Sequence, residues 1–314
     1  MSTATVVSSA EVRSAMSAAC RNGDRAASAF RYDADDPSSR QIAAAAADLR
    51  QALASQPHSD AAAPSASSPA QTAAWPKSVT IDVYAHVLRS KSGGGVPERR
   101  IERQIDVLNG AFAGNESSAA ASSPFRFRLA HVDITVNGEW SRMDEGTIAE
   151  TRAKRALHRG GATDLNLYIG RNRSGSLGWG TQPTRLNSAP MLDGVVIARH
   201  TMPGRSAGHY SAGDAAVHET GHWLGLFHTF AGKCGKRGDL VADTPREARP
   251  SYNCPVHRDT CTAPGDDPVH NYMDYSYDSC MNQFTHGQVV RMGHAWTALR
   301  AAAQLGATGA ARAW

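Results

Sequence analysis

An eleven-residue segment, His218–His228, constrains this chain of 314 residues most strongly, because it follows the pattern HExxHxxGxxH. Residues four positions apart share one face of an α-helix, so His218 and His222 can direct two imidazole nitrogens at one metal ion. The chain must then turn sharply for His228 to reach the same ion, and Gly225 tolerates the positive φ of such a turn. Three neutral histidines leave the fourth position of a zinc ion open for water or a peptide carbonyl, which is typical of catalytic sites.

Glu219 is expected to lie beside this ion without being a ligand. Its carboxylate can take a proton from a zinc-bound water, whose pKa the metal lowers to about 7, and hand it to the leaving amine. The alternative is that these histidines are ordinary surface or core residues. Five fixed positions at about one in twenty each give roughly 3 × 10⁻⁷ per starting position, so the metal site is favoured. The helix is expected over 212–224, with Ser211 as its N-cap and Asp214 in the capping-box position.

A second motif lies downstream, where Asn271–Tyr275 reads NYMDY. A methionine-containing turn after HExxHxxGxxH is the metzincin arrangement. Together with Gly238–Pro245 and Asn271–Arg291, these motifs resemble the pappalysin (cytophagalysin) family of metzincin zinc metallopeptidases. The resemblance covers roughly residues 77–300.

The resemblance implies a secreted zinc endopeptidase whose catalytic domain spans 77–314, with an upper subdomain of about 77–228 and a lower one of about 229–305. It also implies that Met273 forms an apolar floor beneath the zinc and that Tyr275 turns its hydroxyl toward the oxyanion of the reaction. Considered alone, these two residues would be a packing methionine and a buried tyrosine with a satisfied hydroxyl.

The hydrophobic pattern of the catalytic domain predicts an α/β fold with a mixed, twisted sheet and a helix that carries the zinc motif. Alternating residues predict a strand over 79–87, and apolar residues at helical spacing predict a helix that begins near Pro97. Further elements are expected at 125–136, 165–170 and 194–199 as strands and at 147–158 as a helix. An irregular lower region follows, and a C-terminal helix with a Thr285–Gln288 capping box closes the domain.

Five cysteines are present, and four of them cluster after the third histidine, three before the methionine turn and one shortly after it. These four, Cys234, Cys254, Cys261 and Cys280, suggest two disulfides in an oxidising compartment, with a second zinc site as the alternative. No CxxC pair occurs among them, and three pairings are open from the sequence. The family resemblance implies Cys234–Cys261 and Cys254–Cys280.

Residues 1–76, rich in Ala, Ser and Pro, are interpreted as a helical pro-segment with a flexible linker. The resemblance implies that Cys20 occupies the open zinc position and keeps a zymogen latent until the segment is removed. That cysteine is commonly followed directly by glycine in the family, whereas Arg21 follows here, and the alternative is a thiol without a role. Residues 1–19 show no secretory signal, but the disulfide pattern favours secretion.

Gly178 and Trp179 are expected in the edge strand of the sheet, where an extended peptide can bind as an added strand. The alternative is a simple glycine-rich turn. Asp278 could line an acidic pocket that favours Arg or Lys after the scissile bond, with a solvated aspartate as the alternative.

A calcium site is expected just after the zinc motif, where Asp239, Asp243 and Thr244 offer hard oxygen ligands. The resemblance to a Gly-Asp-x-x-x-Asp-Thr-Pro segment supports this site. The alternative is a turn that the aspartate side chains cap.

The chain carries 33 Lys+Arg against 29 Asp+Glu without an aromatic-interleaved basic patch, so nucleic-acid binding is not suggested. It contains no apolar run of about 18 residues that could span a membrane. We expect a protein or peptide substrate, whereas the oligomeric state cannot be predicted. The alternatives to an endopeptidase are a catalytically inactive metal-binding or inhibitory protein on the same fold, and hydrolysis of a non-peptide bond.

Overall fold

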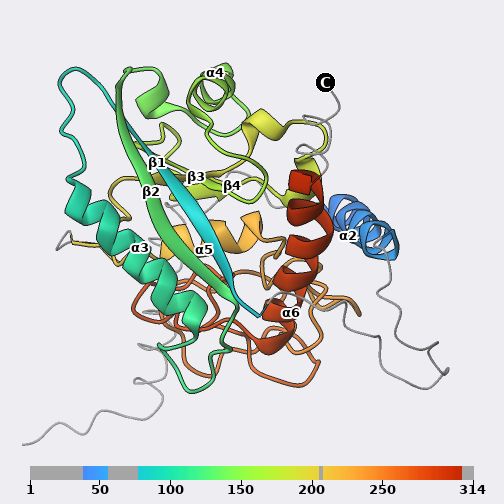
Figure 1. Ribbon diagram of the computed structural model, residues 1–314. Helices are drawn as coiled ribbons and strands as arrows, with labels where there is room; N and C mark the ends of the chain where they lie inside the picture. The colour runs from blue at the N-terminus through green and yellow to red at the C-terminus, as the bar shows by residue number, and fades with distance from the viewer. Residues whose placement is uncertain (1–37, 56–76, 205–207, 306–314) are drawn as a thin grey trace, which may run out of the picture.

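The computed structural model describes residues 38–55, 77–204 and 208–305 (Figure 1). Cys20 and most of the predicted pro-segment and linker lie outside the described residues. The strands are β1 (Val79–Arg89), β2 (Phe125–Val136), β3 (Leu165–Gly170), β4 (Gly178–Gly180) and β5 (Val195–Ala198). The longer helices are α2 (Ser39–Ala54), α3 (Glu98–Ala113), α4 (Ile148–Leu157), α5 (Asp214–Trp223) and α6 (His286–Ala295), which continues as a π-helical turn over Trp296–Ala301.

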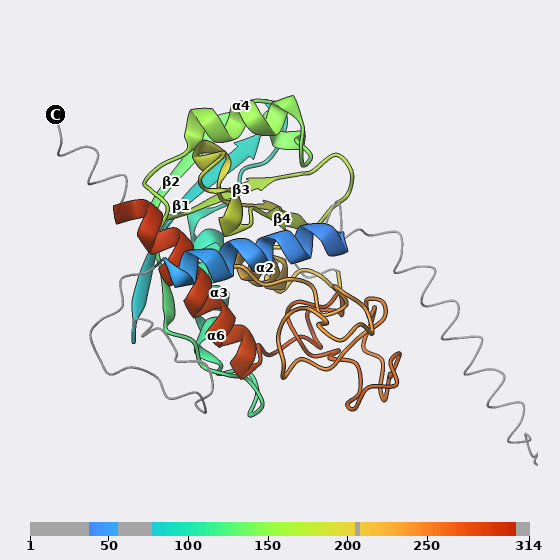
Figure 2. The ribbon, with the colours of Figure 1, turned by 90° about the vertical axis from the view of Figure 1, so that its right-hand side faces the viewer.

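The five strands form one sheet in the order β2-β1-β3-β5-β4. The first four pair in parallel, and β4 runs antiparallel to β5, which confirms the predicted mixed sheet. Alternating side chains of β1 point to opposite faces, so Val83 and Ala85 pack with α3 and α5 whereas Leu88 packs beneath α4. The sheet thus lies between α4 on one face and α3 with α5 on the other (Figures 1 and 2).

Helix α5 is buried on every side, since all ten of its residues are buried. It begins later than predicted, because Gly213 adopts a positive φ of 113° and serves as the N-cap without a side-chain hydrogen bond. The prediction that Ser211 caps this helix is therefore wrong, and its hydroxyl donates to the Gly208 carbonyl at 2.9 Å instead. The carboxylate of Asp278, which lies in a distant segment of the chain, accepts from the Ala212 backbone N–H at 2.7 Å. It thereby satisfies a backbone donor just before the helix.

The segment between α5 and α6 is irregular and is stapled by two disulfides. They join Cys234 to Cys261 and Cys254 to Cys280, with Cα–Cα distances of 5.5 Å and 5.8 Å, and this is the pairing that the family resemblance implies. A capping box then starts α6 as predicted, because the Thr285 hydroxyl accepts from the Gln288 backbone N–H.

Helix α2 belongs to the predicted pro-segment and begins with a capping box at Ser38. It lies across α6 (Figure 2). Its Ile42 packs against Phe227, and its Leu49 packs against Ala295. No helix among the described residues is long and apolar enough to cross a membrane.

Candidate metal centre and active site

The three motif histidines converge on one point, as their spacing predicts. The Nε2 atom of His222 lies 3.2 Å from that of His218 and 3.0 Å from that of His228. A zinc ion bound tetrahedrally at 2.0–2.1 Å would hold two such nitrogens about 3.3 Å apart, so the spacing fits this metal. Across the described residues, these three form the one cluster of histidine, cysteine or carboxylate side chains able to hold a metal ion.

The opposite ring nitrogens fix the tautomer of two of these histidines. His218 directs its Nδ1 at the Tyr272 carbonyl oxygen at 2.6 Å, and His222 directs its Nδ1 at the Leu226 carbonyl oxygen at 2.9 Å. A carbonyl oxygen only accepts hydrogen bonds, so each Nδ1 carries the proton and each Nε2 presents a lone pair. This is the second contact that usually orients a metal-binding histidine.

Gly225 makes the turn that brings the third histidine to the other two. It adopts a φ of 97°, and a Cβ atom there would lie 2.8 Å from the Cβ of Ala295. The turn is closed by a hydrogen bond from the Leu226 N–H to the Gly221 carbonyl at 2.9 Å. Backbone conformation and lack of space therefore both require glycine at this position.

Met273 lies against the helix that carries the first two histidines. It is fully buried, and a Cβ atom on Gly221 would lie 2.5 Å from its sulfur. The backbone carbonyl of Met273 accepts from the Thr229 N–H at 3.1 Å, which ties the methionine turn to the residue after His228. Met273 thus packs directly on α5 at Gly221, and its role as a floor beneath the zinc stays a prediction.

Tyr275 stands beside the third histidine. Its hydroxyl lies 3.3 Å from the Nε2 of His228, and only 7% of the residue is exposed. Its backbone carbonyl accepts from the Tyr210 hydroxyl at 3.1 Å. A phenol O–H in this position can donate to an oxygen that binds next to the metal.

Glu219, the residue after the first histidine, is fully buried against strand β4. A Cβ atom on Gly178 would lie 2.7 Å from the Cγ of Glu219, and one on Gly180 would lie 2.3 Å from its carbonyl oxygen. The two glycines therefore let the strand pack directly on α5. Nothing local in the sequence signals this contact.

The edge position predicted for Gly178–Gly180 is confirmed, because β4 is the last strand of the sheet. The side chain of Trp179 points to the face beneath α4, where its Nε1 donates to Glu150 Oε1 at 2.7 Å. Trp179 can therefore contact a substrate only through the backbone atoms of Trp179.

Asp278 is 8% exposed, which excludes the solvated alternative. Burial raises the pKa of its carboxyl to about 7, against the lowering effect of backbone hydrogen bonds at the start of α5. Its observed partner is thus a helix terminus, and the predicted pocket for a basic side chain stays a prediction.

The three residues of the predicted calcium site have different surroundings. Asp243 accepts from the Thr285 hydroxyl and from the Gly287 N–H, each at 2.8 Å, and so binds the start of α6 with both oxygens. Asp239 is 2% exposed, and burial raises the pKa of its carboxyl to about 7. Thr244 is also buried. The turn-capping alternative describes Asp239, whose Oδ1 accepts from the Val241 backbone N–H at 3.0 Å, and the calcium site stays a prediction.

A buried ion pair holds the far end of α5 and was not predicted. The guanidinium of Arg300, which is fully buried, binds both oxygens of Asp193 at 2.9 Å and 3.1 Å. Arg300 Nε also donates to the carbonyl of Trp223, the last helix residue, and the Trp223 indole N–H donates to Asp193, each at 2.9 Å. A positive charge at a helix C-terminus is favourable, but the three residues lie in separate segments that no sequence pattern connects.

Comparison with known proteins agrees with this site. A peptidase family model described as pregnancy-associated plasma protein-A matches residues 202–297. An extracellular metalloprotease of Colletotrichum graminicola is 44% identical over 233 residues, which cover 72% of this chain and 80% of the relative. Extracellular metalloprotease 1 of Coccidioides posadasii is 41% identical over 231 residues, which cover 71% of this chain and 79% of the relative.

Two solved structures from Tannerella forsythia are similar as well. Mature mirolysin in complex with a cleaved peptide is 28% identical, with a TM-score of 0.59, and the match covers 73% of this chain and 98% of that one. A promirolysin mutant is 25% identical, with a TM-score of 0.65, and the match covers 89% of this chain and 99% of that one. The match thus extends over more of this chain when the proform is compared.

Proposed function

The chain belongs to the pappalysin family of metalloproteases, and on this premise we propose that it is a secreted zinc endopeptidase made as a latent zymogen. The observation that carries the proposal is the convergence of three imidazole Nε2 atoms beside a buried glutamate and a tyrosine hydroxyl. Zinc held by His218, His222 and His228 would lower the pKa of a water molecule and polarise a peptide carbonyl.

The remaining chemistry falls to side chains of this chain. Glu219 accepts a proton from the attacking water and delivers it to the leaving amine, and its burial against β4 keeps its carboxylate in one place. The hydroxyl of Tyr275 donates to the oxyanion that develops on the substrate. The outer edge of β4 binds the substrate as an added strand, through the backbone of Gly178 and Trp179.

A peptide substrate is supported by the cleaved peptide bound to mirolysin. Secretion is supported by relatives that are named extracellular metalloproteases and by the two disulfides. The assignment of residues 1–76 as a pro-segment is supported by the packing of α2 on the body of the protein and by the longer match with promirolysin. Cys20 as the latency switch is part of the same proposal.

A calcium ion at Asp239, Asp243 and Thr244 is a further part of the proposal, supported by the burial of the Asp239 carboxylate. We also propose that Asp278 lines a pocket that binds an Arg or Lys side chain after the scissile bond. Elemental analysis for calcium and cleavage of a peptide library test these two parts separately from the peptidase activity.

The proposal is tested with a quenched peptide or casein, with and without a chelator. We expect activity that the chelator removes and added zinc restores. The variant Glu219→Ala should lose turnover and keep zinc, because the carboxylate is not a ligand. Absence of cleavage by the wild-type chain after removal of residues 1–76 would favour the inactive metal-binding protein instead, and full turnover by Glu219→Ala would refute the mechanism.

A further inference from the structure

We propose that Glu247 is a positioning residue, which holds the third histidine and Tyr275 in register with the other two histidines. The inference rests on the proposed peptidase function. It starts from a difference between the ligands: His218 and His222 are fixed by the backbone of α5, whereas His228 and Tyr275 lie on irregular segments. Side-chain contacts must therefore supply the order that a helix or strand would otherwise give.

One oxygen of Glu247 reaches the residue that follows the third histidine. The hydroxyl of Thr229 donates to Glu247 Oε2 at 2.9 Å, while the Thr229 backbone N–H donates to the Met273 carbonyl at 3.1 Å. Thr229 and Glu247 are both buried, at 1% and 0% exposure. Glu247 thus fixes the segment that carries His228 against the methionine turn.

The other oxygen of Glu247, Oε1, is connected to Tyr275 by hydrogen bonds through Ser251 and Asp274. It accepts from the Ser251 hydroxyl at 2.8 Å, and the Ser251 backbone N–H donates to Asp274 Oδ1 at 2.8 Å. The same oxygen of Asp274 accepts from the backbone N–H of Tyr275 at 2.8 Å. A single carboxylate therefore connects the two irregular segments that bring His228 and the tyrosine to the metal centre.

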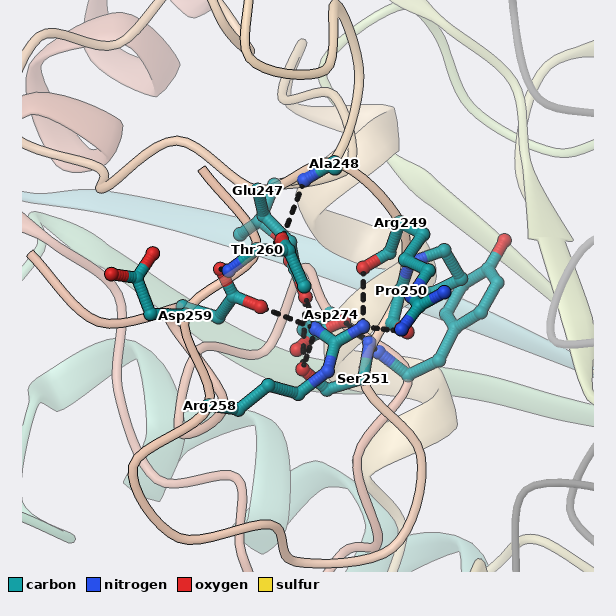
Figure 3. Close-up of polar contacts among 12 residues, drawn as sticks. Glu247, Ala248, Arg249, Pro250, Ser251, Arg258, Asp259, Thr260 and Asp274 are labelled. Atoms are coloured by element: carbon teal, nitrogen blue, oxygen red, sulfur yellow. Dashed lines mark hydrogen bonds and ion pairs between the residues drawn. The ribbon is translucent and has the colours of Figure 1, made fainter. Parts of the chain in front are cut away.

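Arg258 supplies the charge that lets this carboxylate remain buried. Its Nη1 donates to Glu247 at 2.5 Å and to Asp267 at 2.6 Å, and its Nη2 donates to the carbonyls of Arg249 and Pro250 at 3.1 Å each. Figure 3 shows its guanidinium at the centre of these contacts. Burial and the nearby Asp274 raise the pKa of Glu247, and the positive charge of Arg258 lowers it, so the guanidinium offsets part of the cost of burying this carboxylate.

The test uses two variants of similar shape, Thr229→Val and Glu247→Gln, made in the full chain and activated in the same way as the wild type. Thr229→Val removes the hydroxyl that binds Glu247. We expect it to lower zinc affinity and kcat by about 10–100-fold each, with KM nearly unchanged, since contacts that orient metal ligands have effects of that size. Glu247→Gln should lose less, because its amide can still bind both Thr229 and Ser251.

Asp267→Asn is the matched control. It alters the second carboxylate on the same Nη1 atom of Arg258 and the contacts of Asp267 with Thr260, and Asp267 itself contacts neither Thr229 nor Ser251. We expect a lower unfolding temperature with zinc affinity and kcat retained. Zinc affinity is measured by competition with a chelating dye, so it is tested even if no peptide substrate is cleaved.

The proposal is overturned if Thr229→Val keeps wild-type zinc affinity and kcat. It is overturned as well if Asp267→Asn lowers both to the same extent, because the cluster would then act only through stability. Failure of the wild-type chain to cleave any peptide would count against the proposed function, and the zinc competition would still decide this inference.

Discussion

Substitution of Gly178 by alanine tests how closely the edge strand fits the proposed general base. The new Cβ atom would lie 2.7 Å from Glu219 Cγ, 2.9 Å from Glu219 Oε1 and 2.7 Å from the Val196 carbonyl. Ordinary contact begins near 3.4 Å, so about 0.7 Å of movement is needed. The Val196 carbonyl belongs to β5, to which β4 is hydrogen-bonded, and it cannot move far without breaking the sheet.

Two of the three close contacts are therefore relieved by displacement of the Glu219 side chain, and the third by a shift of β4 away from the Val196 carbonyl. A misplacement of about 1 Å can cost about 100-fold in rate, so we expect kcat to fall by about 10–100-fold. Overpacking of a buried contact typically costs about 1–3 kcal/mol of stability. Zinc content should be unchanged, because none of the three nearest atoms to a Cβ at Gly178 belongs to a histidine.

The assay is cleavage of a quenched peptide, with zinc content and thermal unfolding measured on the same sample. Gly95→Ala is the control, since nothing lies within 4 Å of a Cβ atom at that position and its φ is not in the left-handed region. We expect the control to match the wild type in all three measurements. Wild-type kcat in Gly178→Ala would refute the idea that this glycine sets the position of the general base.

Three further predictions follow from the site and its supports. Tyr275→Phe should lower kcat by about 100-fold or more with a small change in KM, because one oxyanion donor is removed, and steady-state kinetics would contradict this if kcat were unchanged. Arg300→Met should destabilise the fold by about 3–5 kcal/mol in chemical denaturation, because the buried Asp193 loses its positively charged partner and keeps only the Trp223 indole N–H; a change below about 1 kcal/mol would argue against the pair. In calcium-free buffer, the pKa of Asp239, raised by burial from 3.8 to about 7, should make stability fall as pH rises between these values, because the unfolded chain releases this proton first. Denaturation of Asp239→Asn across that range should show a weaker fall, and an identical pH profile would contradict the assignment.

The parts of the structure that local patterns determine were predictable. Spacing alone brings His218, His222 and His228 together, and β2 and β3 have the predicted bounds because turn residues and alternation mark their ends. The edge position of Gly178 and the capping box at Thr285 were also within reach. The disulfide pairing required the family resemblance, because three pairings satisfy the spacing.

The contacts that tune the site were not predictable, because they join segments far apart in the chain. Asp278, predicted to line a substrate pocket, binds the start of α5, and Asp243, predicted as a calcium ligand, binds the start of α6. The N-cap of α5 was misplaced at Ser211, because no pattern shows that Gly213 adopts a positive φ. Arg258 likewise gives no local signal, since its partners are set by the tertiary fold.

The most direct test of the account is elemental analysis of the folded, purified chain together with His222→Ala. The account predicts one zinc per chain in the wild type, because three Nε2 atoms converge at a spacing that fits this metal. It predicts that His222→Ala, which removes the central one of the three nitrogens, loses zinc in mild chelator. A wild-type chain that folds without zinc, or a His222→Ala variant that holds zinc as tightly as the wild type, would contradict it.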